Sequence, residues 1–212
     1  MPIYATENVE RGNSRLISYE DFSISEELYG PEALEGIEMG ITEGGFFVDE
    51  LIAETVSILN KKGYKTAFSC SGHLYKNDEP IKVPQSKEIL KIVPDRIKHL
   101  TPENGFFKCG EDDDNLYFYY KGVCSTPQLF FERGIEIPSV PEGFVKKEED
   151  DNFGISIFAK PVKCIIENNE YRYLTREEAS NYLRKMNHNL LEWANQLTNI
   201  NVDTSNKTPG TK

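Results

Sequence analysis

The sequence contains no long apolar run, and this absence limits where the protein can work. A helix needs about 20 consecutive apolar residues to cross a bilayer, and no segment of the 212-residue chain approaches that length. Residues 1–14 are polar and lack the apolar stretch of a secretory signal. We therefore expect a cytoplasmic protein with no membrane partner.

The sequence also has fewer basic residues than acidic ones. The chain has 24 Lys and Arg against 35 Asp and Glu, so its formal net charge is −11. A negative protein repels phosphate backbones, which argues against a nucleic-acid partner. A small-molecule ligand stays open as a partner. The composition carries no indication of an oligomeric state.

Several motifs with well-known chemistry are missing. The four cysteines are far apart and form no C-x-x-C pair, which argues against a zinc ribbon or a thioredoxin-type site; they are Cys70, Cys109, Cys124 and Cys164. The three histidines show no helical ligand spacing, so no metal site is expected from the sequence; they are His73, His99 and His188. No P-loop or dinucleotide-binding glycine fingerprint is present.

Two segments have the apolar periodicity of amphipathic helices. The first covers about 48–62, where Lys61 and Lys62 suit a helix C-terminus and Gly63 suits a left-handed cap. The second covers about 176–198, where Thr175 and Glu178 have the spacing of a capping box. Its apolar stripe, typical of a core-facing helix, consists of Ala179, Tyr182, Leu183, Met186, Leu190, Trp193, Ala194 and Leu197.

Segments rich in aromatic and β-branched residues lie between these helices and predict strands. They cover 64–71, 116–120, 128–132 and 153–159, with a hairpin around 168–169. We predict an α+β fold, in which a mostly antiparallel sheet packs against the two main helices. The domain should span 46–198, with an insertion over about 76–114. Residues 1–45 should form a partly ordered arm, and 199–212 a disordered tail.

The segment with the most chemical potential is Ser-Cys-Ser-Gly-His at 69–73. In an unbroken strand, alternation would place Ser69, Ser71 and His73 on one face, and Cys70 on the other. Gly72 allows unusual dihedral angles and close approach of a ligand. The polar face therefore predicts a site for a small polar or anionic ligand. The alternative is a polar strand end whose groups are capped by water.

Two interpretations of Cys70 remain open. The thiol can be a small buried core residue, or it can form a nucleophilic pair with His73. The pair requires the chain to turn at Gly72 so that both side chains reach the same side. No catalytic residue is assigned from the sequence.

Two stretches of the chain, 45–50 and 66–72, resemble the wybutosine-synthesising tRNA methyltransferase family. That family has a Gly-x-Val-Asp-Glu start, a helix, and then a Ser-Ser-Cys-Ser-Gly-Arg strand. The matching positions here are Val48, Asp49, Glu50, Ser69, Cys70, Ser71 and Gly72. His73 stands where the family has arginine. The pattern that keeps this histidine is similar to uncharacterised proteins of Gram-positive bacteria and their phages.

The resemblance implies a function as well as a fold. It implies methyl transfer from S-adenosylmethionine, with Asp49 or Glu50 binding a hydroxyl or amine of the ligand. The site predicted from these considerations consists of Asp49, Glu50, Ser69, Ser71, Gly72 and His73. The alternative is a noncatalytic bacterial or phage interaction protein, in which the same loop only closes a strand.

Overall fold

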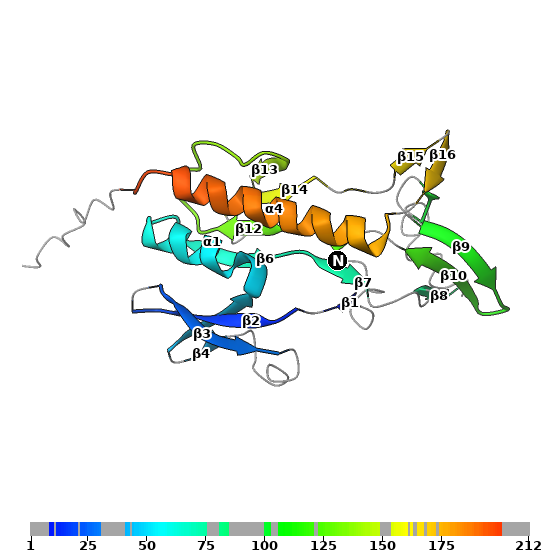
Figure 1. Cartoon of the computed structure of the whole chain (residues 1–212), viewed down its shortest axis with the longest axis horizontal. Coiled ribbons are helices and arrows are strands. Elements are labelled where there is room, and N and C mark those ends of the chain that lie inside the picture. The colour runs from blue at the N-terminus through cyan, green and yellow to red at the C-terminus, as the bar shows by residue number, and fades with distance from the viewer. Residues whose placement is uncertain are drawn as a thin grey trace, which may run out of the picture.

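A computed structural model of the chain describes most of the region before residue 201 (Figure 1). The described residues are 9–10, 12–20, 22–30, 41–42, 44–75, 81–84, 100–102, 106–120, 123–148, 154–160, 162, 165–167, 169–172 and 174–200. The predicted tail lies outside them except for its first two residues. Within them, no helix combines the length and apolar character that crossing a membrane requires.

The first helix, α1, covers Glu50–Lys61. Gly63 follows with φ of 90°, so the predicted left-handed residue after the helix is confirmed. The predicted start was wrong, because Val48 belongs to a strand and the helix begins two residues later. Leu51, in the first turn of α1, is apolar but 52% exposed.

Much of the predicted N-terminal arm is regular sheet. The strands β2 (Ser14–Ser18), β3 (Ile24–Tyr29), β4 (Ile41–Thr42) and β5 (Gly45–Asp49) pair in the order β3-β2-β5-β4. All three pairings are antiparallel. The sheet lies on the side of α1 that faces away from the second helix (Figure 1). Since β5 leads directly into α1, the sheet fixes where that helix begins.

A second four-stranded sheet carries the central segment of the chain. Its strands are β6 (Thr66–Cys70), β12 (Gln128–Phe131), β13 (Phe144–Glu148) and β14 (Ile155–Ala159). They pair antiparallel in the order β13-β14-β12-β6. The strands predicted over 64–71, 128–132 and 153–159 are confirmed with slightly shorter bounds.

In the part of the chain that the structure describes, the remaining strands form three small antiparallel sheets. One contains β1 (Val9–Glu10), β7 (His73–Tyr75) and β11 (Val123–Ser125). Another contains β8 (Ile81–Pro84), β9 (Phe106–Glu111) and β10 (Asn115–Tyr120), and the first two of these strands lie in the predicted insertion. The hairpin of β15 (Ile165–Glu167) and β16 (Glu170–Arg172) is the one predicted around 168–169.

The second helix, α4, covers Arg176–Gln196, and its predicted capping box is present. The Thr175 hydroxyl accepts a hydrogen bond from the Glu178 N–H at 3.1 Å, and the Glu178 carboxylate accepts one from the Thr175 N–H at 2.8 Å. Arg172 also donates two hydrogen bonds of 2.9 Å to this carboxylate. The start of α4 is therefore fixed by local side chains.

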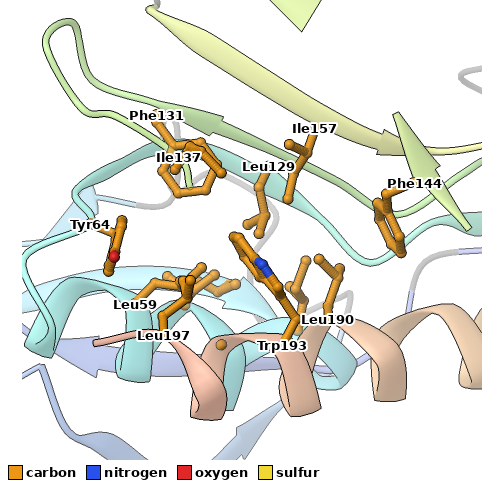
Figure 2. Close-up of a cluster of buried hydrophobic side chains, with 14 of the residues drawn as sticks. Leu59, Tyr64, Leu129, Phe131, Ile137, Phe144, Ile157, Leu190, Trp193 and Leu197 are labelled. Atoms are coloured by element: carbon orange, nitrogen blue, oxygen red, sulfur yellow. The ribbon is translucent and has the colours of Figure 1, made fainter. Parts of the chain in front are cut away.

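The core lies where the two helices meet both four-stranded sheets. Figure 2 shows Leu190 and Trp193 of α4 pointing toward Leu129 and Ile157 of the central sheet. On the opposite side of α1, Ile17 of β2 is fully buried in the same cluster. The predicted α+β class is correct. The strands divide among several antiparallel sheets, because α1 separates β5 from β6 and has a sheet on each side.

Leu190→Ala tests this core. Leu190 is fully buried, and its truncation should lower the free energy of unfolding by about 2–5 kcal/mol. The exposed Leu51→Ala is the matched control and should change stability by no more than about 0.5 kcal/mol. Urea denaturation measures both values. Equal effects of the two variants would contradict the packing described above.

The start of α4 should also respond to acid. Hydrogen bonds from Arg172 and from the Thr175 backbone lower the Glu178 pKa from 4.5 to about 2. Because the folded pKa is the lower one, the resulting stabilisation is present above about pH 4.5 and is lost as pH falls toward 2. The stability difference between wild type and Glu178→Gln should therefore shrink over that window, as followed by urea midpoints.

Glu177→Gln, in the same helical turn, is the control for this titration. A stability difference for Glu178→Gln that stays constant from pH 6 to pH 2 would contradict the assigned role of the carboxylate.

Candidate functional site

The strand predicted over 64–71 ends in a sharp turn that separates β6 from β7. Gly72 has a φ of 82°, a backbone angle that residues other than glycine rarely adopt. A Cβ at this position would lie 2.7 Å from Leu183 Cδ2, 2.8 Å from the Ser125 carbonyl oxygen and 2.9 Å from Pro127 Cδ. The turn therefore depends on glycine for both its backbone angle and its close packing against α4.

Asp49 connects this turn to the start of α1. It occupies the N-cap position, but its side chain caps no backbone N–H of that helix. Its Oδ2 instead accepts hydrogen bonds from the Ser71 backbone N–H at 2.9 Å and from the Ser71 hydroxyl at 3.1 Å. N-cap aspartates ordinarily satisfy the first helical N–H groups. Here the carboxylate is oriented toward the loop.

His73 lies near the same oxygen of this carboxylate. Its Nε2 is 3.7 Å from Asp49 Oδ2, which is beyond the usual range for a direct hydrogen bond. The two side chains are 22% and 25% exposed. The carboxylate and the imidazole thus meet at the surface, within reach of a ligand.

Cys70 is buried, as one of the two sequence-based interpretations predicted. Its Sγ accepts a hydrogen bond from the Gly72 N–H at 3.4 Å and lies 3.8 Å from Ser125 Oγ. Phe68, two positions earlier in the same strand, is 49% exposed and contacts the Phe130 ring edge-on. The burial of Cys70 therefore comes from the turn and from β11, not from a uniformly buried strand face.

One carboxylate oxygen of Asp49, Cys70 Sγ and a ring nitrogen of His73 lie within 4.8 Å of one another. These three residues are called the Asp49–Cys70–His73 cluster below. Strand alternation would have placed Cys70 and His73 on opposite faces. The left-handed turn at Gly72 breaks that alternation and brings both side chains toward Asp49.

Asn187 of α4 supports the cluster and was not found from the sequence. Its Nδ2 donates 2.8 Å hydrogen bonds to the Ser71 and Leu183 carbonyl oxygens. The residue is 4% exposed, and within the described structure its Oδ1 has no hydrogen-bond partner. A buried amide inside the apolar stripe of α4 was the available signal, but its partner lies 116 positions away.

The other predicted site residues differ in their placement. Ser71 donates to Asp49, His73 lies 3.7 Å from the same carboxylate, and Gly72 forms the turn between Ser71 and His73. Ser69 is opposite Leu129 in the β6–β12 ladder, one position before Cys70. Glu50 accepts a 3.5 Å hydrogen bond from Arg15 of β2. The structure therefore brings Cys70 into the predicted group and ties Glu50 to the N-terminal sheet.

An open surface hollow of about 490 Å³ lies beside β7. It is lined by Leu74, Arg176, Glu177, Ser180, Asn181 and Arg184. Leu74 packs with the apolar cluster of Leu183, whereas the adjacent His73 faces Asp49. The hollow and the cluster are therefore on different faces of β7.

Comparisons with protein-family models, with curated proteins and with solved structures gave no match to this chain.

Gly72→Ala tests how closely the turn is packed. Gly134 has a similar φ of 85°, but a Cβ there would meet no atom within 4 Å. Gly134→Ala should lower the free energy of unfolding by about 1–2 kcal/mol, because of its left-handed backbone alone. Gly72→Ala should lose about 1–3 kcal/mol more, because the added methyl overpacks the turn. Urea denaturation of both variants gives the difference, and equal losses would contradict the close packing.

Proposed function

We propose that Asp49 and the loop at 69–73 bind a small polar ligand through a hydroxyl or amine group. The observation that carries this proposal is the orientation of Asp49. Its carboxylate leaves its own helix uncapped and faces a part-exposed imidazole. A carboxylate offers about four acceptor positions, of which Ser71 uses two. A donor group on a ligand can use the remaining capacity.

The charge of the site favours a hydroxyl or amine over an anion at this position. A carboxylate or phosphate placed directly against Asp49 would meet a like charge. His73 Nε2, on the exposed side of the cluster, can donate or accept a hydrogen bond according to its tautomer. The ligand group that contacts Asp49 is therefore a donor, and a neighbouring acceptor on the ligand suits His73.

The remaining loop residues prepare the site more than they contact the ligand. Ser71 is 5% exposed, and its hydroxyl is directed to Asp49. Gly72 is buried against Leu183. Both residues hold the carboxylate and imidazole in place, so their effect on a ligand is indirect.

Methyl transfer from S-adenosylmethionine is the catalytic form of this proposal. The two stretches that resemble the tRNA methyltransferase family are separated in sequence, yet Asp49 of the first accepts hydrogen bonds from Ser71 of the second. That contact supports treating the two stretches as one site. The ribose hydroxyls and the amine of S-adenosylmethionine supply the donors that Asp49 accommodates.

Thermal unfolding with millimolar S-adenosylmethionine, S-adenosylhomocysteine or adenosine tests the proposal. A ligand at 100 times its Kd stabilises the native state by about 2.7 kcal/mol. For a chain of this size, each kcal/mol raises Tm by about 2–4 °C, so we expect an increase of about 5–10 °C. Asp49→Asn and His73→Ala should abolish it.

The control variants are Asp113→Asn and His188→Ala. Asp113 is exposed between β9 and β10, and His188 is exposed on α4, so both lie far in sequence from the loop at 69–73. They should keep the full increase in Tm. A response to adenosine alone would reject the methyl donor while keeping the polar-ligand site. No response to any of the three compounds would reject S-adenosylmethionine and favour the noncatalytic interaction protein.

A further inference from the structure

We infer that the Asp49–Cys70–His73 cluster binds one zinc-like divalent metal ion and leaves a coordination position for a ligand. The cluster offers one sulfur, one imidazole nitrogen and one carboxylate oxygen. These are the three donor types that Zn²⁺ uses in proteins, and three protein ligands with an exchangeable fourth are typical of catalytic zinc sites.

The spacing of the donor atoms fits this assignment. Atoms bound tetrahedrally to one zinc ion, at about 2.0–2.3 Å each, are about 3.3–3.8 Å apart. His73 Nε2 lies 3.7 Å from Asp49 Oδ2. Both hydrogen bonds from Ser71 fall on Oδ2, so Oδ1 of the same carboxylate keeps its lone pairs for a metal ion. No pair of the three donor atoms exceeds 4.8 Å.

Each of two ligands is already oriented by a hydrogen bond from the loop. Ser71 donates twice to Asp49, and the Gly72 N–H donates to Cys70 Sγ. Asn187 in turn donates to the Ser71 carbonyl from the buried face of α4. Metal sites characteristically have such supporting hydrogen bonds, which orient the ligands and tune their basicity. An N–H donor at sulfur also stabilises a thiolate, which is the form that binds metal.

Burial and charge favour a metal ligand over a nucleophile at Cys70. The residue is only 7% exposed, so a substrate carbon has poor access to its sulfur. An ion can enter from the side of Asp49 and His73, whose side chains are 25% and 22% exposed. A thiolate and a carboxylate together carry the two negative charges that balance a divalent ion. Binding releases the Cys70 thiol proton to solvent, so affinity falls at lower pH.

This inference deepens the proposed function, because a metal ion would hold the ligand's oxygen or nitrogen at its fourth position. It shares residues with the proposed ligand site, but it is tested without any organic ligand. Failure of metal binding and failure of ligand binding are therefore separate results.

Titration of chelator-treated, reduced full-length protein with Co²⁺ tests the site. We expect one Co²⁺ per chain, the intense visible bands of a tetrahedral ion, and a near-ultraviolet thiolate-to-metal charge-transfer band. Zn²⁺ should displace Co²⁺ and remove these bands. Zn²⁺ alone should raise Tm, and a chelator should reverse that increase.

Variants identify the ligands. Cys70→Ala should abolish the charge-transfer band. His73→Asn and Asp49→Asn should each lower the Co²⁺ affinity by about 100-fold or more, because losing a direct ligand should cost at least as much as losing a residue that supports one. Ser71→Ala should weaken it by about 10–100-fold. The matched controls are Cys109→Ala and His188→Ala, both at exposed positions. They should bind Co²⁺ as the wild type does.

Three results would overturn the inference: no Co²⁺ binding at micromolar concentrations, a spectrum without the charge-transfer band, or wild-type binding by His73→Asn. The wild-type spectrum decides the role of sulfur even if Cys70→Ala does not fold. His73 is part-exposed, so its replacement is compatible with folding, and circular dichroism verifies that.

Discussion

Ser71 donates two hydrogen bonds to one oxygen of Asp49, and these bonds tie the two four-stranded sheets together. Asp49 ends β5 of the N-terminal sheet, and Ser71 directly follows β6 of the central sheet. Asn187 of α4 holds the carbonyl of the same serine. Two sheets and two helices therefore meet at one buried residue. The positions of Cys70 and His73, on either side of this junction, depend on it.

The turn at Gly72 converts that junction into a chemical site. A continuous strand would direct Cys70 and His73 to opposite faces. The positive φ of Gly72 ends the strand, and the contact with Leu183 keeps the turn in a single arrangement. Strand glycines often mark such close approaches. The two chemically active side chains converge because the regular structure stops between them.

Local signals predicted the helices better than the site. The capping box of Thr175 and Glu178 and the left-handed Gly63 depend on neighbours within a few residues, so the sequence alone was sufficient for both. β5 was missed because Val48 fits a helical pattern and a strand equally well. Its strand state comes from pairing with Arg15 of β2, which is distant in sequence.

The site itself depends on contacts that periodicity cannot reveal. The predicted residues Asp49, Ser71, Gly72 and His73 do meet. The turn at Gly72 that a Cys70–His73 pair requires was an open alternative and not a prediction. Strand alternation separated Cys70 from His73, and histidine spacing alone gave no indication of a mixed cluster. Asn187 was not recognised, because it lies within the apolar stripe of α4 and its partner, Ser71, is far away in the chain.

His73 stands where the methyltransferase pattern that the sequence resembles has arginine, and the two side chains differ in what they can do beside Asp49. An arginine beside Asp49 would be a permanent cation that pairs with the carboxylate and cannot ligate a metal. A neutral imidazole can ligate one, and its Nε2 lies 3.7 Å from the carboxylate. If the proposed metal ion is bound, it supplies the positive charge that arginine would have supplied. With that ion bound, an anion that bare Asp49 repels would bind at the fourth coordination position. On this proposal, the two ligand classes expected from the sequence would correspond to two states of one site.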